Sequence, residues 1–301
     1  MNNKNFDVVI DFGSSRIRVA AIKKDNKKIS FYYQSDYFSD PLKAKSEMEK
    51  IIPYLEKDTN EYLDSINLMV DSTGMLSINL SIFKSFDGSK LKKEDIQFLI
   101  QEAKQQVLRN YSDQSIMHII VKKYKIDGKD YTLMPQDIIC YRLSIDIIFI
   151  SLPKKTIHQL KEFFFNLDIS INQIFYSSYA KSINYKDNFT SIGNISFIDM
   201  GYNKTSITHY DENEIIFLQV LPIGGNYITK DLSKVLNIDL AEAEKIKIDF
   251  VKNKSGSIDK NFSLDLIQKI IFARVEEILE LCDKSIKLNR NLEKSSKFKM
   301  V

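Results

Sequence analysis

The chain has 301 residues, of which 44% are apolar and 28% are charged, and its formal net charge is +3. These values are typical of a soluble globular protein with more than one domain, and such a small net charge gives no reason to expect nucleic acid as a partner. The sequence contains neither an apolar stretch of signal-peptide type nor a run of about 18 apolar residues, so we expect a cytoplasmic protein.

Residues 1–80 begin what we expect to be the first half of the molecule. Three apolar bursts predict a meander of strands within residues 7–33. A helix follows, in which Pro53 predicts a kink or a break. A strand over residues 66–70 comes next, and from Leu76 apolar and polar residues alternate as in a half-buried strand.

Residues 81–165 have a different pattern, which predicts a small α+β module inserted into the first half. The expected order is strand–helix–strand–strand–helix. The alternating strand from Leu76 leads into it, and the other elements are expected over residues 92–107, 117–124, 141–152 and 157–165. Because strands and helices alternate over short distances here, this block can bury an apolar core of its own.

The strand–turn–strand pattern starts again at Ile195, after residues 166–194, which we assign to the first half. We expect residues 195–226 to form a phosphate-binding core of the second half. Residues 227–301 are expected to form an outer helical subdomain, with an incomplete return to the core. Its most amphipathic helix is predicted over residues 263–282.

One motif occurs in both halves. A short apolar strand leads into Asp-x-Gly, then small or polar residues and a basic residue, and a second strand follows. Backbone N–H groups in such a turn suit an anion, and glycine allows a ligand to approach the backbone. The residues concerned are Asp11, Gly13, Ser14, Ser15 and Arg16 in the first copy, and Asp199, Gly201, Lys204 and Thr205 in the second. We therefore predict a duplicated phosphate-binding hairpin.

The aspartate of each copy has a different predicted role. A carboxylate repels phosphate, so Asp11 and Asp199 are expected to hold a metal ion or its water shell. Oxygen ligands of this kind suit Mg²⁺.

A second anion signal lies at Gly224, Gly225 and Asn226, where two glycines precede a predicted helix. The N-terminus of a helix is a natural site for an anion. In the next helix, Glu244 and Lys247 are three positions apart and lie on one face. They are placed to bracket a ribose, but on the pattern alone an ordinary solvated face with charge pairs is the better interpretation.

Other site classes find little support in the sequence. Cys140 and Cys282 each lie in an apolar stretch, which favours two buried free thiols. The three histidines form no cluster with cysteine, so a structural zinc site is not expected. We also find no Ser/His/Asp triad and assign no catalytic residue.

Together these segments resemble the actin-fold superfamily, and within it the FtsA family of bacterial cell-division proteins. The resemblance rests on the two hairpins, on residues 221–232 with Ala243, Glu244 and Lys247, and on residues 270–279. The inserted module resembles the extra subdomain of that family. The implied fold is an α/β, duplicated actin-like (ribonuclease H-like) fold with an inserted small α+β subdomain.

The resemblance implies a nucleotide site between the halves, with ATP and Mg²⁺ as ligands. Asp11 and Asp199 would manage Mg²⁺, and the phosphates would contact the residues Gly13, Ser14, Ser15, Arg16, Gly201 and Thr205. Gly224, Gly225 and Asn226 would line the phosphate end, with Glu244 and Lys247 near the ribose.

The resemblance also implies partners and a location. The family self-associates into filaments and binds the C-terminal peptide of the tubulin-like protein FtsZ, here through about residues 227–301. Other divisome proteins would bind the inserted subdomain. The membrane contact would come only from a C-terminal amphipathic helix, which is not in this chain, at the cytoplasmic face of the inner membrane at the division site.

Three departures from the family pattern modify these expectations. Tyr202 stands where a glycine is usual, and its bulk would obstruct close approach to the second turn. Residues 176–180 lack the usual Glu-Pro, so no carboxylate is placed to orient a hydrolytic water, and we expect weak or absent ATPase activity. The chain ends where an adenosine-binding Gly-Gly-Gly turn should begin, so we expect either a fragment or a shortened relative.

Three other functions remain open from the sequence. A scaffold like the pilus-assembly protein PilM would share the insertion and the Gly-Gly…Ala-Glu-x-x-Lys pattern, but Asn226 and Asp231 favour FtsA. A kinase-like phosphotransferase would need a catalytic carboxylate and a substrate pocket, and neither is evident in the second half. Tyr202 also suggests a member that binds no nucleotide.

Overall fold

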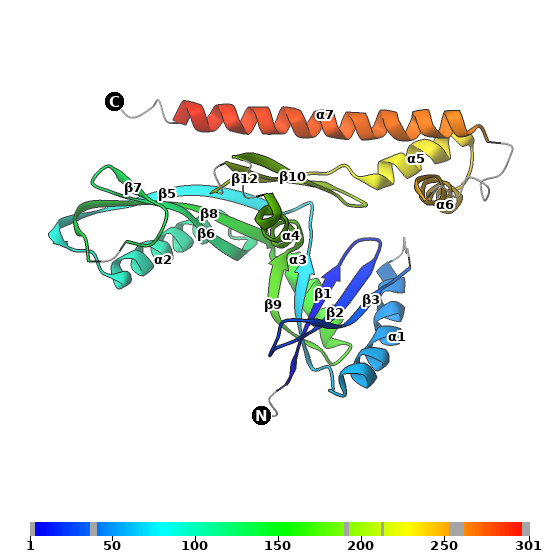
Figure 1. The fold of residues 1–301 in the computed structure, drawn as a ribbon, viewed down its shortest axis with the longest axis horizontal. Helices are drawn as coiled ribbons and strands as arrows, with labels where there is room; N and C mark the ends of the chain where they lie inside the picture. Colours follow the sequence, from blue (N-terminus) through cyan, green and yellow to red (C-terminus); the bar gives the residue numbers. More distant parts are fainter. Residues whose placement is uncertain are drawn as a thin grey trace. The chain divides into compact units, whose positions relative to one another are not determined.

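The computed structural model describes residues 4–36, 41–135, 137–189, 193–211, 214–252 and 262–296. The chain divides into two compact units, Met1–Thr190 with Asn213–Ile215, and Ser191–Glu212 with Ile216–Val301. Each unit has its own sheet structure (Figure 1). Each unit also buries apolar residues of its own.

The first unit begins with the predicted meander, in which neighbouring strands pair antiparallel. Two later strands join it in parallel, giving the order β3-β2-β1-β4-β9. The five strands are β1 (Phe6–Phe12), β2 (Ile17–Lys23), β3 (Ile29–Gln34), β4 (Ser65–Val70) and β9 (Ser170–Tyr176). Because β1, β4 and β9 are parallel, their carboxyl ends meet at one edge of the sheet.

Two helices are connected directly to strands of this sheet: α1 (Pro41–Thr59) lies between β3 and β4 in the sequence, and α4 (Ser177–Lys186) follows β9. Helix α1 packs on β2 and β3, and its Met48, Ile51 and Leu55 are buried. It continues through Pro53, so the predicted break there is wrong. Helix α4 begins immediately after β9, followed by the short 3-10 helix η1 (Asp187–Phe189). The start of α4 therefore lies at the edge where the parallel strands end.

The inserted module forms a separate four-stranded antiparallel sheet in the order β5-β8-β6-β7. Its elements are β5 (Leu76–Lys90), α2 (Lys93–Asn110), β6 (Gln114–Ile126), β7 (Lys129–Tyr131) and β8 (Ile139–Pro153). Leu99 and Ala103 of α2 share one buried cluster with Ile145 and Phe149 of β8. The sequence therefore predicted the α+β character of this module correctly, although β5 is much longer than the alternating segment suggested.

Helix α3 (Lys154–Phe165) connects the inserted module to the main sheet. Its Phe163 and Phe164 rings lie 5.1 Å and 5.7 Å, centre to centre, from the ring of Phe12 on β1. The helix thus packs against the first-half sheet, although the sequence analysis placed residues 157–165 in the module. The four-part domain division stays a prediction.

The second unit combines an antiparallel sheet with three helices. Its strands are β10 (Asn194–Met200), β11 (Thr205–Asp211) and β12 (Glu214–Leu221), and its helices are α5 (Gly225–Leu236), α6 (Leu240–Val251) and α7 (Leu264–Ser296). Helix α7 is longer than predicted and contributes to two apolar clusters, one with α5 and α6 and one with β11 and β12. Among the described residues, none of the helices is long and apolar enough to span a bilayer.

Cys140 and Cys282 are both buried free thiols, as the sequence predicted. Residues 297–301, where the incomplete return to the core was expected, lie outside the described residues.

Candidate functional site

The first hairpin turn is closed by its glycine. The Gly13 N–H donates to the carbonyl of Arg16 at 3.0 Å. A Cβ at position 13 would come within 2.7 Å of that carbonyl oxygen, which is backbone and cannot rotate away. Within the part of the chain that the structure describes, neither Ser14 nor Ser15 takes part in a hydrogen bond. The turn therefore presents two serines whose polar groups are available to a ligand.

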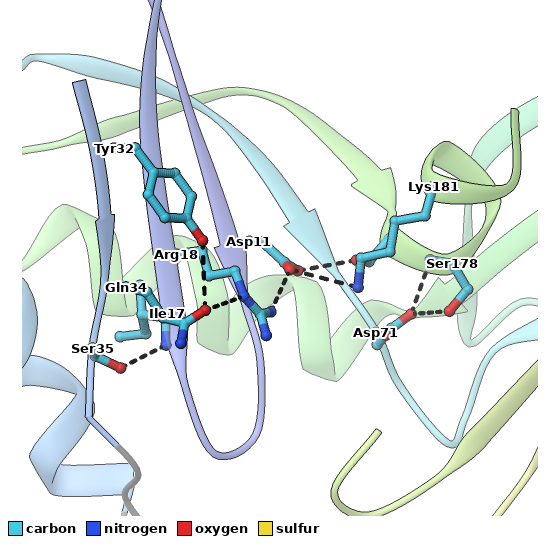
Figure 2. A network of polar contacts seen from close by, with 10 residues as sticks. Asp11, Ile17, Arg18, Tyr32, Gln34, Ser35, Asp71, Ser178 and Lys181 are labelled. Carbon is cyan, nitrogen blue, oxygen red and sulfur yellow. Dashed lines mark hydrogen bonds and ion pairs between the residues drawn. The ribbon is translucent and has the colours of Figure 1, made fainter. Parts of the chain in front are cut away.

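Asp11 lies one residue before the end of β1 and is engaged on both carboxylate oxygens. Its Oδ1 accepts a hydrogen bond from Ser177 Oγ at 3.0 Å. Its Oδ2 lies 3.0 Å from Arg18 Nη1 and 3.6 Å from Lys181 Nζ. Figure 2 shows Asp11 between Arg18 on one side and Lys181 on the other. Because only 14% of the Asp11 side chain is exposed, these contacts are partly screened from solvent.

Local structure explains both cationic partners. The pairing of β1 with β2 places Arg18 directly opposite Asp11, and residues opposite each other in antiparallel strands bring their side chains together. Ser177 and Lys181 are four positions apart on α4 and so share one face of the helix. Both point to Asp11 because α4 begins where β9 ends.

Asp71 is the second carboxylate at this edge, immediately after β4. Its Oδ1 accepts hydrogen bonds from Ser178, from Oγ at 3.1 Å and from the backbone N–H at 3.4 Å. The first turn of α4 thus holds two strand-end aspartates, an arrangement that the partial positive charge at a helix N-terminus favours.

The start of α4 is also held by the inserted module. His118 of β6 follows an irregularity in the β6–β8 register, and its Nε2 accepts from the backbone N–H of Tyr176 at 3.0 Å. The ring of Tyr179 packs edge-on against the imidazole at 5.1 Å. Burial lowers the pKa of His118 below its ordinary value, which keeps the neutral acceptor form.

The surroundings of Asp11 do not fit a directly bound Mg²⁺. Both oxygens already have donors, and two of the three donors are cationic. Throughout the described residues, no three His, Cys, Asp or Glu side chains are grouped so that they could hold a metal ion, and this includes the surroundings of Asp199. A metal at Asp11 would have to displace Arg18 and Lys181.

The second hairpin turn is closed by the same kind of backbone hydrogen bond as the first. The Gly201 N–H donates to the carbonyl of Lys204 at 2.8 Å. Lys204 thus occupies the position of Arg16, as the duplicated motif predicted. The Lys204 side chain is buried, and Ser206, not a basic residue, pairs with Asp199 across the strands.

Unlike the first turn, the second is joined to the N-terminus of α5. The backbone N–H groups of Gly225 and Asn226 donate to the carbonyls of Gly201 and Tyr202, at 2.9 Å and 2.7 Å. A Cβ on Gly224 would meet three backbone atoms of the turn at 2.5–2.8 Å. Gly224 therefore allows close contact between the turn and α5. Two helix N–H groups that were predicted to face an anion are paired with protein carbonyls.

Glu244 and Lys247 join α6 to α5. Lys247 Nζ donates to Gly225 O at 3.0 Å, to Thr229 Oγ1 at 2.8 Å and to Glu244 Oε2 at 2.6 Å. Thr229 Oγ1 also donates to Glu244, and the Tyr202 ring lies 5.6 Å from the Lys247 ammonium. The side chain of Glu244 is only 7% exposed, and that of Lys247 is 14% exposed. The interpretation of these residues as a solvated helix face is therefore wrong, whereas the ribose role stays a prediction.

Two family models match the chain. The model "Cell division protein FtsA" matches residues 196–291, and the model "SHS2 domain inserted in FTSA" matches residues 74–151. Together they cover more than half of the sequence and include both the second hairpin and the inserted module. The chain belongs to the FtsA family.

Individual FtsA proteins agree with this assignment. The cell division protein FtsA of Bacillus subtilis (strain 168) is 26% identical over 95% of this chain, which corresponds to 71% of that protein. FtsA of Buchnera aphidicola subsp. Schizaphis graminum is 25% identical over 65% of this chain, but only 50% of its own length is covered. The chain thus spans between half and about seven tenths of these FtsA proteins.

A solved structure shares the architecture. A chain of the "PilM-PilN type IV pilus biogenesis complex" superposes with a TM-score of 0.68, covering 94% of this chain and 77% of that one. At 10% identity this likeness concerns the fold alone. The predicted duplicated actin-like α/β fold with an inserted small α+β subdomain is confirmed, and this subdomain is the segment that matches the SHS2 model.

Sequence reasoning missed four residues that contact the strand-end aspartates: Arg18, Ser177, Ser178 and Lys181. Arg18 could have been found from the hairpin, because a turn at residues 13–16 fixes which residue faces Asp11. The spacing of Ser177 and Lys181 fits one helix face, but residues 176–180 were considered only for the missing Glu-Pro. Asp71, which directly follows the predicted strand over residues 66–70, had no predicted role.

Proposed function

We propose that this chain is an FtsA-like adaptor of bacterial cell division, which binds ATP, forms filaments and links FtsZ to the cytoplasmic face of the inner membrane. The observation that carries the proposal is the match of two separate FtsA models, one on the second half and one on the inserted SHS2 domain. The finer activities are those that the FtsA resemblance implies.

Nucleotide binding is supported most directly by the first turn. Ser14 and Ser15 form no hydrogen bond with any residue that the structure describes, and they follow Gly13 at the carboxyl end of a parallel strand. Ligands of open α/β sheets bind beyond the carboxyl ends of the strands. We propose that these residues and Arg16 contact the phosphates. The roles that the FtsA resemblance implies for Gly201, Thr205 and residues 224–226 at the phosphates, and for Glu244 and Lys247 at the ribose, stay proposals.

ATP acts in this proposal as a structural ligand with little or no hydrolysis. The start of α4 presents Ser177 and Ser178, whose hydroxyls donate to Asp11 and Asp71. Serine is not basic enough to activate water by itself, so this segment supplies no general base. A ligand that binds only the folded state stabilises it by mass action, and it would favour the filament-forming conformation in the same way.

The partner functions are assigned to separate surfaces. Residues 227–301 would bind the C-terminal peptide of FtsZ, and the inserted module would bind other divisome proteins. Self-association into filaments would involve both halves.

A peptide-binding measurement tests the adaptor function. We would titrate purified protein into a fluorescently labelled FtsZ C-terminal peptide and follow anisotropy, with a scrambled peptide as the control. We expect saturable binding of the FtsZ peptide only. Binding of a PilN-derived peptide in place of the FtsZ peptide would contradict the proposal and favour a pilus scaffold.

A further inference from the structure

The FtsA resemblance assigns Mg²⁺ to Asp11, and the structure surrounds this carboxylate with other partners. We propose that Arg18 and Lys181 take the place of a divalent cation at Asp11, so that the first turn binds the phosphates of a nucleotide without a metal ion. The proposal rests on the proposed nucleotide binding and goes beyond it by naming the groups that replace the metal.

The first argument is the saturation of Asp11. A metal ligand must turn a lone pair of an oxygen towards the ion, and Mg²⁺ requires near-ideal octahedral geometry at about 2.0–2.1 Å. Asp11 Oδ2 already faces two cationic nitrogens at 3.0 Å and 3.6 Å, and Oδ1 faces a hydroxyl at 3.0 Å. These are the distances of charge-assisted hydrogen bonds and ion pairs, and they hold Asp11 in place without a metal.

The second argument is electrostatic. Arg18 and Lys181 place two positive charges beside Asp11, and like charges repel a divalent cation. The other carboxylate of this edge, Asp71, accepts hydrogen bonds from the hydroxyl and the backbone N–H of Ser178. The same two cations attract the negative charge of a phosphate.

The third argument is access. The side chains of Arg18 and Lys181 are 40% and 33% exposed, so both cations remain open to solvent. Arg18 donates through Nη1 to Asp11 and through Nε to Gln34. A guanidinium has five N–H donors in a planar fork that matches phosphate, so this residue retains donors for a ligand. Asp11 would therefore be a positioning residue for Arg18 and Lys181.

ATP binding with and without metal tests the proposal. We would measure the dissociation constant of ATP by calorimetry in buffer with EDTA and in buffer with Mg²⁺, for the wild type, Arg18→Gln and Arg18→Lys. We expect the wild-type constants to agree within about threefold, and Arg18→Gln to weaken binding about tenfold or more in both buffers, as expected for loss of a charge-assisted contact. Arg18→Lys should retain most of the affinity, which would exclude a folding defect.

A loss of wild-type affinity of more than tenfold in EDTA would overturn the proposal. A second measurement does not need nucleotide. It monitors Mn²⁺ binding to the ligand-free protein through the electron paramagnetic resonance signal of free Mn²⁺. We expect the wild type and Asp11→Asn to take up the same amount, with Asp7→Asn as a control on the same strand, where Asp7 forms an exposed pair with Lys24. The proposal would also be overturned if the wild type and Asp7→Asn bind Mn²⁺ and Asp11→Asn does not.

The two measurements distinguish a failure of this proposal from a failure of the proposed nucleotide binding. If ATP binds in neither buffer, nucleotide is removed from the proposed function, and the manganese titration alone then decides whether Asp11 is a metal ligand.

Discussion

The turns at residues 13–16 and 201–204 close with the same hydrogen bond, from the glycine N–H to the carbonyl three residues later, at 3.0 Å and 2.8 Å. Their surroundings differ in kind. Side chains of β2 and α4 surround the aspartate of the first hairpin, whereas the backbone of α5 is bonded to the second turn. Side-chain partners can be exchanged for groups of a ligand, but backbone partners are fixed by the fold. The first turn is therefore better suited to accept a phosphate, and the second to hold the second unit together.

The largest expected effect concerns the attachment of the second turn. Replacing Lys247 by Met leaves the buried carboxylate of Glu244 without its cation, and breaking a buried pair in this way costs about 3 kcal/mol or more. The free energy of unfolding, from urea denaturation, measures the loss. The double variant Glu244→Gln with Lys247→Met should be less destabilised than Lys247→Met alone. Equal losses would mean that the pair contributes nothing through its charge.

Alanine substitutions at two neighbouring glycines test the contact between the second turn and α5. Gly224→Ala places a Cβ within 2.5–2.8 Å of three backbone atoms, and forcing a methyl group into such a packed contact costs about 2 kcal/mol. In Gly225→Ala the new Cβ lies at least 3.6 Å from its neighbours, so we expect stability close to wild type. Urea denaturation of both variants measures the difference, and an equal loss in both would contradict the contact.

A smaller difference separates the two turns themselves. A Cβ would lie 2.7 Å from the Arg16 carbonyl oxygen in Gly13→Ala, but 3.3 Å from the Lys204 carbonyl oxygen in Gly201→Ala. We expect Gly13→Ala to be the less stable variant by about 1 kcal/mol, because the tighter contact forces the backbone to move. Thermal unfolding monitored by circular dichroism measures both. The reverse order would show that the second turn is the more constrained one.

The smallest effect concerns the support that His118 gives to the start of α4. Burial lowers the pKa of this histidine in the folded protein. As the pH falls below about 6.5, the unfolded chain therefore binds a proton that the folded protein does not, and stability decreases. His118→Gln keeps an acceptor for the Tyr176 N–H and should lack this part of the pH dependence. Urea denaturation between pH 7.5 and pH 5 compares the two, and identical pH profiles would exclude the role of His118.

The sequence was sufficient for the features that depend on neighbouring residues. The meander, the two hairpins and the glycines of their turns follow from local patterns, and the structure contains them. The distant partners of Asp11 were not found because they lie far along the chain: Ser177 is 166 positions away and meets Asp11 through the pairing of β1 with β4 and of β4 with β9. The burial of Glu244 and Lys247 was missed for a similar reason, since a pair three residues apart has the same pattern whether or not another helix covers it.

The central claim is that the first turn binds the phosphate groups. The most direct test is a titration of ¹⁵N-labelled protein with ATP in EDTA, followed by the amide chemical shifts of both turns. We predict that Ser14, Ser15 and Arg16 shift with saturation, while Gly225 and Asn226 keep their positions because their N–H groups stay bonded to the second turn. Saturable shifts at Gly225 and Asn226 with none at residues 14–16 would contradict the account.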